Sequence, residues 1–202
     1  MTPLSRRAFT AGALASLLVG CGGAPNDGRA DRTPTAAPPP AAAKKAKALG
    51  RSVPVSLRIP AIGVDTPVMR LGLAKDGTMQ VPPITAQDRA GWYRHSPTPG
   101  QIGPSVIVGH VTVGTYGDGV FRRLAELGRG DEITASLENG ATAEFAVSDV
   151  RKIAKADFPA DDVYGDVDRP ELRLITCGGR LTGDGYLDNV IVFATLTSTS
   201  GP

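Results

Sequence analysis

The sequence is poor in the residue types that most often carry chemistry or large interfaces. Its 202 residues contain two cysteines, two histidines and one tryptophan, and only 5% are aromatic. The formal net charge of +2 gives no reason to expect a nucleic-acid partner. Glycine and proline are abundant instead, with 25 and 17 residues. This composition favours short strands joined by turns over a helical bundle.

The N-terminus has the features of an export signal. Arg6 and Arg7 precede an apolar run at residues 8–20, which is too short to span a bilayer well. The paired arginines resemble a twin-arginine signal, and the small residues before Cys21 resemble a lipobox. We therefore expect a signal peptide at residues 1–20 and a lipid on Cys21. An ordinary cleaved signal followed by an incidental cysteine is the alternative.

A lipid on Cys21 would leave Cys177 as a free thiol in an exported protein, which is unusual and suggests chemistry. Residues 21–52 are rich in alanine and proline and have few large apolar side chains. We expect them to form a disordered, semi-extended spacer. Its lysines are a solvated run or lie near anionic lipid. The remaining chain divides into one domain at residues 53–198 and a tail at 199–202.

The domain has the pattern of a mainly β protein. Apolar alternation or buried runs predict strands at residues 55–59, 62–68, 78–81, 92–93, 105–109, 131–137, 142–153, 171–177 and 189–196. Asn139-Gly140 is a strong hairpin signal between two of them. The spacing of apolar residues predicts a short helix at 120–127, and residues 158–164 favour a further helical turn. Many short strands with little helix indicate a closed barrel or a sandwich.

Cys177 ends one of these strands. Leu172, Leu174 and Thr176 alternate with the residues between them, and Gly178-Gly179 follows the sulfur. A thiol at the end of a rigid strand, beside two glycines, is firmly held and leaves room for a substrate backbone. The alternative is a buried core cysteine, which is common for a free thiol.

His110 ends another buried strand, directly after Gly109. A thiolate is a nucleophile, and a nearby imidazole can ionise the thiol or protonate a leaving amine. A histidine after a strand can equally be structural. The three soft ligands Cys177, His95 and His110 lack metal-site spacing, so we expect no metal and no cofactor.

The sequence resembles a sortase, and within that family it resembles class F. The likeness spans the whole domain in order, at residues 55–68, 91–93, 106–111, 120–131, 174–179 and 188–194. Its most specific parts are Gly109-His110 and, downstream, Leu174-Ile175-Thr176-Cys177. The resemblance implies an eight-stranded sortase-type barrel with one or two short helices.

The resemblance also implies a cysteine transpeptidase acting on proteins with a Leu-Pro-x-Thr-Gly-like sorting signal. Cys177 would form a thioester with the residue before the scissile bond, and a cell-wall amine or water would resolve it. His110 would protonate the leaving amine and deprotonate the acceptor. We expect a monomer held by the lipid on Cys21 at the extracytoplasmic face of the cell membrane.

The sequence departs from the family where its catalytic arginine is expected, because Leu187 stands there. Arg180 could take that role, although a loop arginine is more often merely solvated. Asn189 could donate a neutral hydrogen bond to the oxyanion instead. Thr176 could contact the substrate or serve only as a β-branched strand residue. Thr112 is a second departure, since an acidic residue is expected after the histidine.

Other classes of protein remain as alternatives. A papain-like protease would have its cysteine before its histidine, which is the reverse of the order here. An L,D-transpeptidase would carry a histidine close to its cysteine, and Cys177 has none nearby in sequence. Another exported cysteine peptidase remains open. So does a sortase-shaped lipoprotein that binds peptides without cleaving them, which the missing arginine favours.

Overall fold

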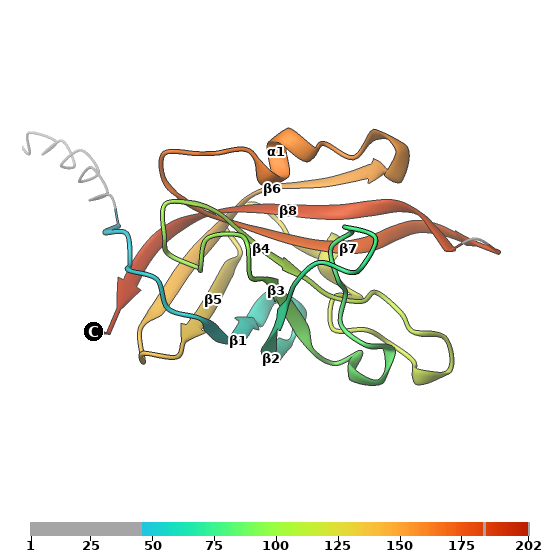
Figure 1. Cartoon of the computed structure of the whole chain (residues 1–202), viewed down its shortest axis with the longest axis horizontal. Coiled ribbons are helices and arrows are strands. Elements are labelled where there is room, and N and C mark those ends of the chain that lie inside the picture. Colours follow the sequence, from blue (N-terminus) through green and yellow to red (C-terminus); the bar gives the residue numbers. More distant parts are fainter. Residues whose placement is uncertain (1–45, 184, 202) are drawn as a thin grey trace, which may run out of the picture. The chain divides into compact units, whose positions relative to one another are not determined.

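Eight strands close into one β-barrel in the computed structural model (Figure 1), which describes residues 46–183 and 185–201. The strands are β1 Pro54–Ile59, β2 Val64–Leu71, β3 Ala90–Tyr93, β4 Gly103–Val108, β5 Glu132–Leu137, β6 Thr142–Ala154, β7 Pro170–Thr182 and β8 Gly185–Ser200. The helical segments are α1 Ala160–Tyr164 and the 3-10 turns Pro60–Ile62, Ile84–Ala86, Gly114–Tyr116, Leu124–Glu126 and Lys155–Asp157. The expected signal peptide and the Cys21 lipid site lie outside the described residues.

The strands pair in the order β1-β2-β3-β4-β7-β8-β6-β5, and β5 returns to β1 to close the barrel. The pairs β2–β3 and β4–β7 are parallel, and the others are antiparallel. The prediction of a mainly β, closed, eight-stranded barrel with few short helices is therefore confirmed. In the described part of the chain, no helix is long and apolar enough to cross a bilayer.

The hairpin predicted at Asn139-Gly140 joins β5 to β6. Gly140 adopts φ 84°, a left-handed conformation that glycine reaches without steric cost. The Asn139 side-chain oxygen accepts a hydrogen bond of 3.1 Å from the Ala141 amide, which satisfies the turn locally. Local residue chemistry alone thus fixes this connection.

Two sequence expectations differ from the structure. Residues 120–127 do not form one helix, because a turn precedes the short 3-10 segment Leu124–Glu126. The turn arises because the Phe121 amide bonds back to the His110 carbonyl at 2.9 Å. Residues 78–81, where a strand was expected, form only an isolated bridge between Met79 and Leu73. Pro82 and Pro83 follow, and neither has a backbone amide hydrogen to donate to a neighbouring strand.

The barrel has apolar residues on both sides of its β4, β7 and β8 wall. The interior cluster includes Ile107, Leu172, Leu174 and Val192. A second cluster lies on the outer face, formed by Leu71, Val106, Val108, Val163, Ile175, Ile191 and Phe193. Because Val163 of α1 belongs to this outer cluster, α1 covers the outside of the wall. Strands that are buried on both faces have nearly continuous apolar sequences, as these do.

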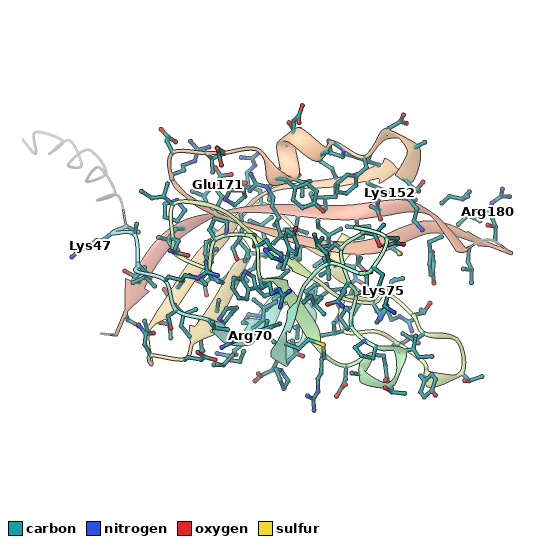
Figure 2. All side chains as sticks on the ribbon, in the orientation of Figure 1. Lys47, Arg70, Lys75, Lys152, Glu171 and Arg180 are labelled. Atoms are coloured by element: carbon teal, nitrogen blue, oxygen red, sulfur yellow. The ribbon has the colours of Figure 1, made fainter. Side chains whose placement is uncertain are left out.

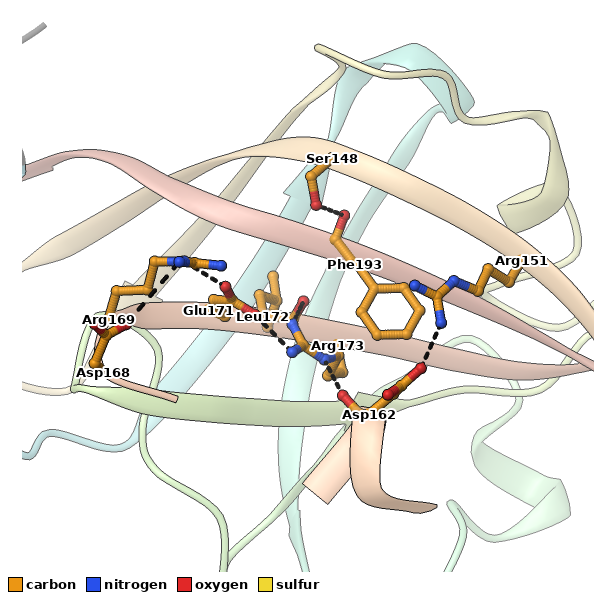
Figure 3. A network of polar contacts seen from close by, with 9 residues as sticks. All are labelled: Ser148, Arg151, Asp162, Asp168, Arg169, Glu171, Leu172, Arg173 and Phe193. Carbon is orange, nitrogen blue, oxygen red and sulfur yellow. Dashed lines mark hydrogen bonds and ion pairs between the residues drawn. The ribbon is translucent and has the colours of Figure 1, made fainter. Parts of the chain in front are cut away.

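An ionic network, buried at Arg173 and Glu171 and more exposed at Arg151 and Asp162, holds α1 over this wall (Figure 3). Arg173, on the outer face of β7, donates to Glu171 at 2.6 Å and to the Asp162 carbonyl of α1 at 3.2 Å. Arg151 of β6 reaches the Asp162 carboxylate at 2.6 Å. The guanidinium carbons of Arg151 and Arg173 lie 4.4 and 4.6 Å from the centre of the Phe193 ring. These contacts hold α1 and the segment after it in place.

Residues on both sides of the expected domain also contact the barrel. Leu49 is partly buried against the interior cluster, and its amide bonds to the Gly100 carbonyl at 2.8 Å. The Ser52 amide donates to the Thr98 hydroxyl at 3.3 Å. The last residues of the expected spacer therefore pack on the barrel, and β8 continues into the expected tail as far as Ser200.

Candidate active site

Cys177 lies within β7, which continues past it to Thr182 because residues 178–182 still pair with β8; the expectation that the cysteine ends its strand is therefore wrong. The Cys177 side chain points toward the outer face of the barrel wall. It shares that face with Arg173 and Ile175, because alternate residues of a strand point to the same side. Cys177 is a half-buried free thiol. The strand is irregular just beyond it, and Gly179 adopts φ 76° at this bulge. The glycines after the sulfur thus let the chain bend away from it.

His110 follows the end of β4, the parallel neighbour of β7. The register pairs Val106 with Arg173 and Val108 with Ile175. Continuing it by two residues puts His110 opposite Cys177, on strands about 5 Å apart. Both residues line the same cavity of about 280 Å³. The structure therefore brings together the two residues that the sequence singled out.

The His110 ring is oriented by a backbone group that the sequence did not reveal. Its Nε2 lies 2.6 Å from the carbonyl oxygen of Pro82, in the connection between β2 and β3. A carbonyl can only accept a hydrogen bond, so Nε2 carries the proton and donates it. In the neutral ring Nδ1 is then the atom free to take a proton. No side-chain pattern could have indicated this contact, because a main-chain atom makes it.

A second contact ties the two strand ends together. The Thr176 hydroxyl donates to the Gly109 carbonyl at 2.8 Å, and the Gly109 amide donates to the Ile175 carbonyl at 3.1 Å. Thr176 is 4% exposed, and its side chain faces the barrel interior with Leu174. Its hydroxyl is therefore engaged in holding the residue before His110 against the residue before Cys177.

Gly109 is required by close packing rather than by its backbone angles. A Cβ at this position would lie 2.6 Å from a Val120 methyl and 2.7 Å from the Phe121 ring. The turn after His110 can therefore pack directly on the end of β4 only if residue 109 has no side chain. Thr112 of the same connection bonds to the Tyr186 hydroxyl of β8 at 2.6 Å. The acidic residue expected at position 112 is thus replaced by a link between the turn and β8.

Asn189 is the cross-strand partner of Cys177 on β8. It lies on the opposite side of Cys177 from His110, and it lines the same cavity. Side chains directly opposite each other on antiparallel strands have Cβ atoms about 4.5–5.5 Å apart. Asn189 can therefore present an amide donor beside the sulfur.

Arg180 and Leu187 lie farther along the β7–β8 hairpin. Figure 2 shows Arg180 close to the tip of this hairpin, and it is exposed and absent from the residues that line the cavity. Leu187 shares the face of Asn189 two residues away and is 45% exposed. Among the described residues, the polar side chains that line the cavity next to the sulfur are thus those of His110, Asn189 and Thr176. The Thr176 hydroxyl is already bonded to the Gly109 carbonyl.

His95, the other histidine, is remote from this pair in the fold. It lies after β3 and lines a second cavity, of about 470 Å³, at the beginning of β4. Its Nε2 accepts a hydrogen bond of 3.3 Å from Arg94. Tyr164 at the end of α1 lines both cavities, and burial, reinforced by nearby Tyr93, raises the pKa of its phenol above the usual value.

Comparison with known families agrees with this geometry. The family model described as the sortase domain matches residues 57–197. The chain belongs to the sortase family. Sortases are transpeptidases that join proteins carrying a sorting motif to cell-wall amines. The match covers every strand of the barrel wall that carries the cavity, including His110, Cys177 and Asn189.

Solved sortase structures share the barrel of this sortase domain. They include a Clostridium perfringens sortase D5 transpeptidase at 23% identity, covering 72% of this chain and 78% of that one with a TM-score of 0.54. SrtA from Actinomyces oris is 25% identical, with coverages of 75% and 82% and a TM-score of 0.54. A lid mutant of sortase A from Corynebacterium diphtheriae is 20% identical, with coverages of 73% and 72% and a TM-score of 0.55. No curated protein sequence matches the chain.

Proposed function

We propose that this sortase is a class F enzyme that uses Cys177 as its nucleophile and His110 as its proton carrier. The observation that carries the proposal is the single cavity lined by both residues, with His110 just after β4 and Cys177 on its parallel neighbour β7. A thiol and an imidazole so arranged can carry out acyl transfer without a metal. The class assignment depends on the sequence motifs around these two residues.

In the proposed reaction, the Cys177 sulfur attacks the carbonyl carbon before the scissile bond of a Leu-Pro-x-Thr-Gly-like signal. A C–S bond forms and the C–N bond breaks, while the proton of the thiol passes through His110 to the leaving amine. Because Nε2 is held by the Pro82 carbonyl, Nδ1 is the atom that carries this proton. An acceptor amine then attacks the thioester; a C–N bond forms, the C–S bond breaks, and a proton of the amine passes through Nδ1 to the sulfur, which restores the thiol. Water in place of the amine gives hydrolysis.

Asn189 is the proposed donor to the oxyanion that forms during each attack. Its position beside Cys177, opposite His110, leaves the carbonyl oxygen of the substrate between two polar groups. A neutral amide donates a weaker hydrogen bond than an arginine, since charge-assisted bonds are about twice as strong. Arg180 is the weaker candidate, because it is exposed near the hairpin tip and does not line the cavity.

Cleavage of a fluorogenic Leu-Pro-x-Thr-Gly peptide, with and without an added amine, tests this proposal. We expect Cys177→Ala to abolish cleavage and His110→Ala to reduce kcat at least a hundredfold. His95→Ala is the matched control for kcat at saturating peptide, because it removes the only other imidazole and lies outside the active-site cavity. Full activity of Cys177→Ala, or equal losses in the two histidine variants, would refute the assignment.

A binding protein without catalysis is the second candidate, and Leu187 in place of the family's arginine favours it. Such a protein would bind the peptide and leave it intact, also when an amine is added. Mass spectrometry of the peptide after prolonged incubation separates the two candidates. A thioester adduct on Cys177 supports the enzyme, whereas unchanged peptide and unmodified protein support the binding protein.

We further propose that a lipid on Cys21 holds the enzyme at the extracytoplasmic face of the membrane. The proposal depends on the lipobox-like sequence before Cys21. Cys21→Ser should release the protein from the membrane fraction, and mass spectrometry should find diacylglycerol on the wild-type residue. A Cys21→Ser protein that stays in the membrane fraction contradicts the anchor.

A further inference from the structure

The active-site cavity continues into the second cavity along the outer face of β4. Met79 and Tyr164 line both of them. Val108 and His110 line the first, while Pro104 and Val106 line the second, so alternate residues of one strand form a common floor. The two cavities are therefore neighbours, and together they are called the groove, which starts at Cys177 and follows β4 back toward its beginning.

A bound peptide that extends beyond the active-site cavity has one open path along the surface of the barrel. Part of the outer face of β7 is covered by α1, because Arg173 bonds to the Asp162 carbonyl and Val163 belongs to the outer apolar cluster. The face of β3 and β4 is hollowed instead, next to Tyr93 and Pro104. A sorting signal has four residues before its scissile bond and one after it. The long groove suits the longer part, which stays attached to Cys177 as the acyl group.

The length of the groove exceeds the length of the sorting signal. Val106 and Pro104 lie four and six residues before His110, which corresponds to about 13–20 Å of extended chain. With the residue before the scissile bond opposite His110, the four-residue motif ends just short of Val106. The second cavity then receives the first to third residues that precede the motif.

The lining of the second cavity suits a basic side chain. Asp166 lies at its rim, and no cation of residues 46–183 or 185–201 lies within 4.0 Å of this carboxylate. The rings of Tyr93 and Tyr164 meet edge to face with their centres 6.4 Å apart. Aromatic faces beside a carboxylate attract an ammonium or guanidinium group, and Met79 can contact its aliphatic stem.

The nearby cations do not occupy this place. Arg94 donates through Nε to His95 Nε2, so this guanidinium nitrogen is already engaged. Lys75 and Arg94 are exposed and are absent from the cavity lining. The Asp76 carboxylate, in the turn beside Gly77, is already bonded to the amide and hydroxyl of Thr78. Asp166 is therefore the charged side chain that lines the cavity.

We propose that the second cavity binds a lysine or arginine one to three residues before the sorting motif, through Asp166, Tyr93 and Tyr164. This inference assumes the proposed function and adds a determinant of which surface proteins are chosen. The substrates that it favours carry a basic residue just before the motif, and those with an acidic residue there are disfavoured.

The test compares labelled peptides that differ only in lysine, alanine or glutamate at the residue directly before the motif. Their affinities are measured by fluorescence anisotropy on the full chain carrying Cys177→Ala, which prevents turnover. Cleavage is measured separately on the chain with Cys177 intact. We expect the lysine peptide to bind about five- to thirtyfold more tightly than the glutamate peptide. Moving the lysine six residues before the motif should remove the advantage.

Asp166→Asn should bring the lysine-to-glutamate affinity ratio close to one. Asp161→Asn is the matched control, because it makes the same change on an exposed residue of α1 outside the cavity, and it should keep the ratio. Equal affinities in the Asp166-containing chain, or a ratio that survives Asp166→Asn, would overturn the inference. Absence of cleavage with an intact affinity ratio would refute the proposed enzyme and leave the basic subsite standing.

Discussion

The clearest quantitative consequence of the site geometry concerns Asn189. Its side chain lies across from Cys177 on the neighbouring strand and lines the cavity that also holds His110. If its amide donates to the developing oxyanion, Asn189→Ala removes a hydrogen bond that matters only in the transition state. We therefore expect kcat to fall while KM changes little.

The size of the effect follows from the kind of donor that is lost. Removing one oxyanion donor costs about 10²–10³ in kcat, or about 2.7–4 kcal/mol. Asn189 is neutral and only half-buried, so we expect a loss near the lower end, about a hundredfold. Asn189→Asp is a close match in size that replaces the donor by an acceptor, and it should be at least as slow.

A substitution at Leu187 tests the same role by restoring activity instead of removing it. It lies two residues from Asn189 on the same face of β8, and its side chain is 45% exposed. An arginine can therefore be introduced without displacing a buried group, and it would stand where the family's arginine is expected. Leu187→Arg should restore much of the activity lost in Asn189→Ala and should not slow the wild-type enzyme.

The assay is steady-state cleavage of the fluorogenic sorting peptide, with thermal unfolding measured on every variant. Unfolding midpoints within a few degrees of the wild type exclude a folding defect as the cause. Wild-type kcat in Asn189→Ala would refute the role given to this amide. Arg180→Ala serves as the parallel test, and a large loss there would transfer the oxyanion role to the hairpin arginine.

The remaining predictions concern the contacts that support the site. Thr176→Val should cost about 1–3 kcal/mol of folding stability and lower kcat about tenfold, because the Gly109 carbonyl loses its hydrogen-bond donor. Thr176→Ser keeps the hydroxyl and should retain the stability and the kcat of the wild type. A fully active valine variant would contradict the positioning role. Arg173→Met should lower stability by about 3 kcal/mol and the unfolding midpoint by roughly 6–12 °C, because Glu171 loses its buried partner. Arg169→Met removes the exposed partner of the same carboxylate and should cost less than about 1 kcal/mol of folding stability. Equal losses of stability in the two arginine variants would refute the argument from burial.

Much of the barrel was predictable because its signals are local. The Asn139-Gly140 turn and the alternation of residues 172–177 depend on side chains only a few positions apart. Many such short signals indicated a closed barrel or a sandwich, and the resemblance to sortases implied the closed barrel. The helix expected at residues 120–127 was wrong in extent, because the Phe121 amide bonds to the distant carbonyl of His110 and turns the chain there.

The sequence singled out Cys177 and His110, since a free thiol and one of only two histidines lie at predicted strand ends and the sortase-like motifs contain the same two residues. It could not rank Asn189 above Arg180, because that choice depends on which residue faces Cys177 across two strands. The Pro82 carbonyl and the groove along β4 belong entirely to the tertiary structure. A main-chain oxygen has no sequence signature, and a cavity exists only where segments distant in sequence fail to fill the space between them.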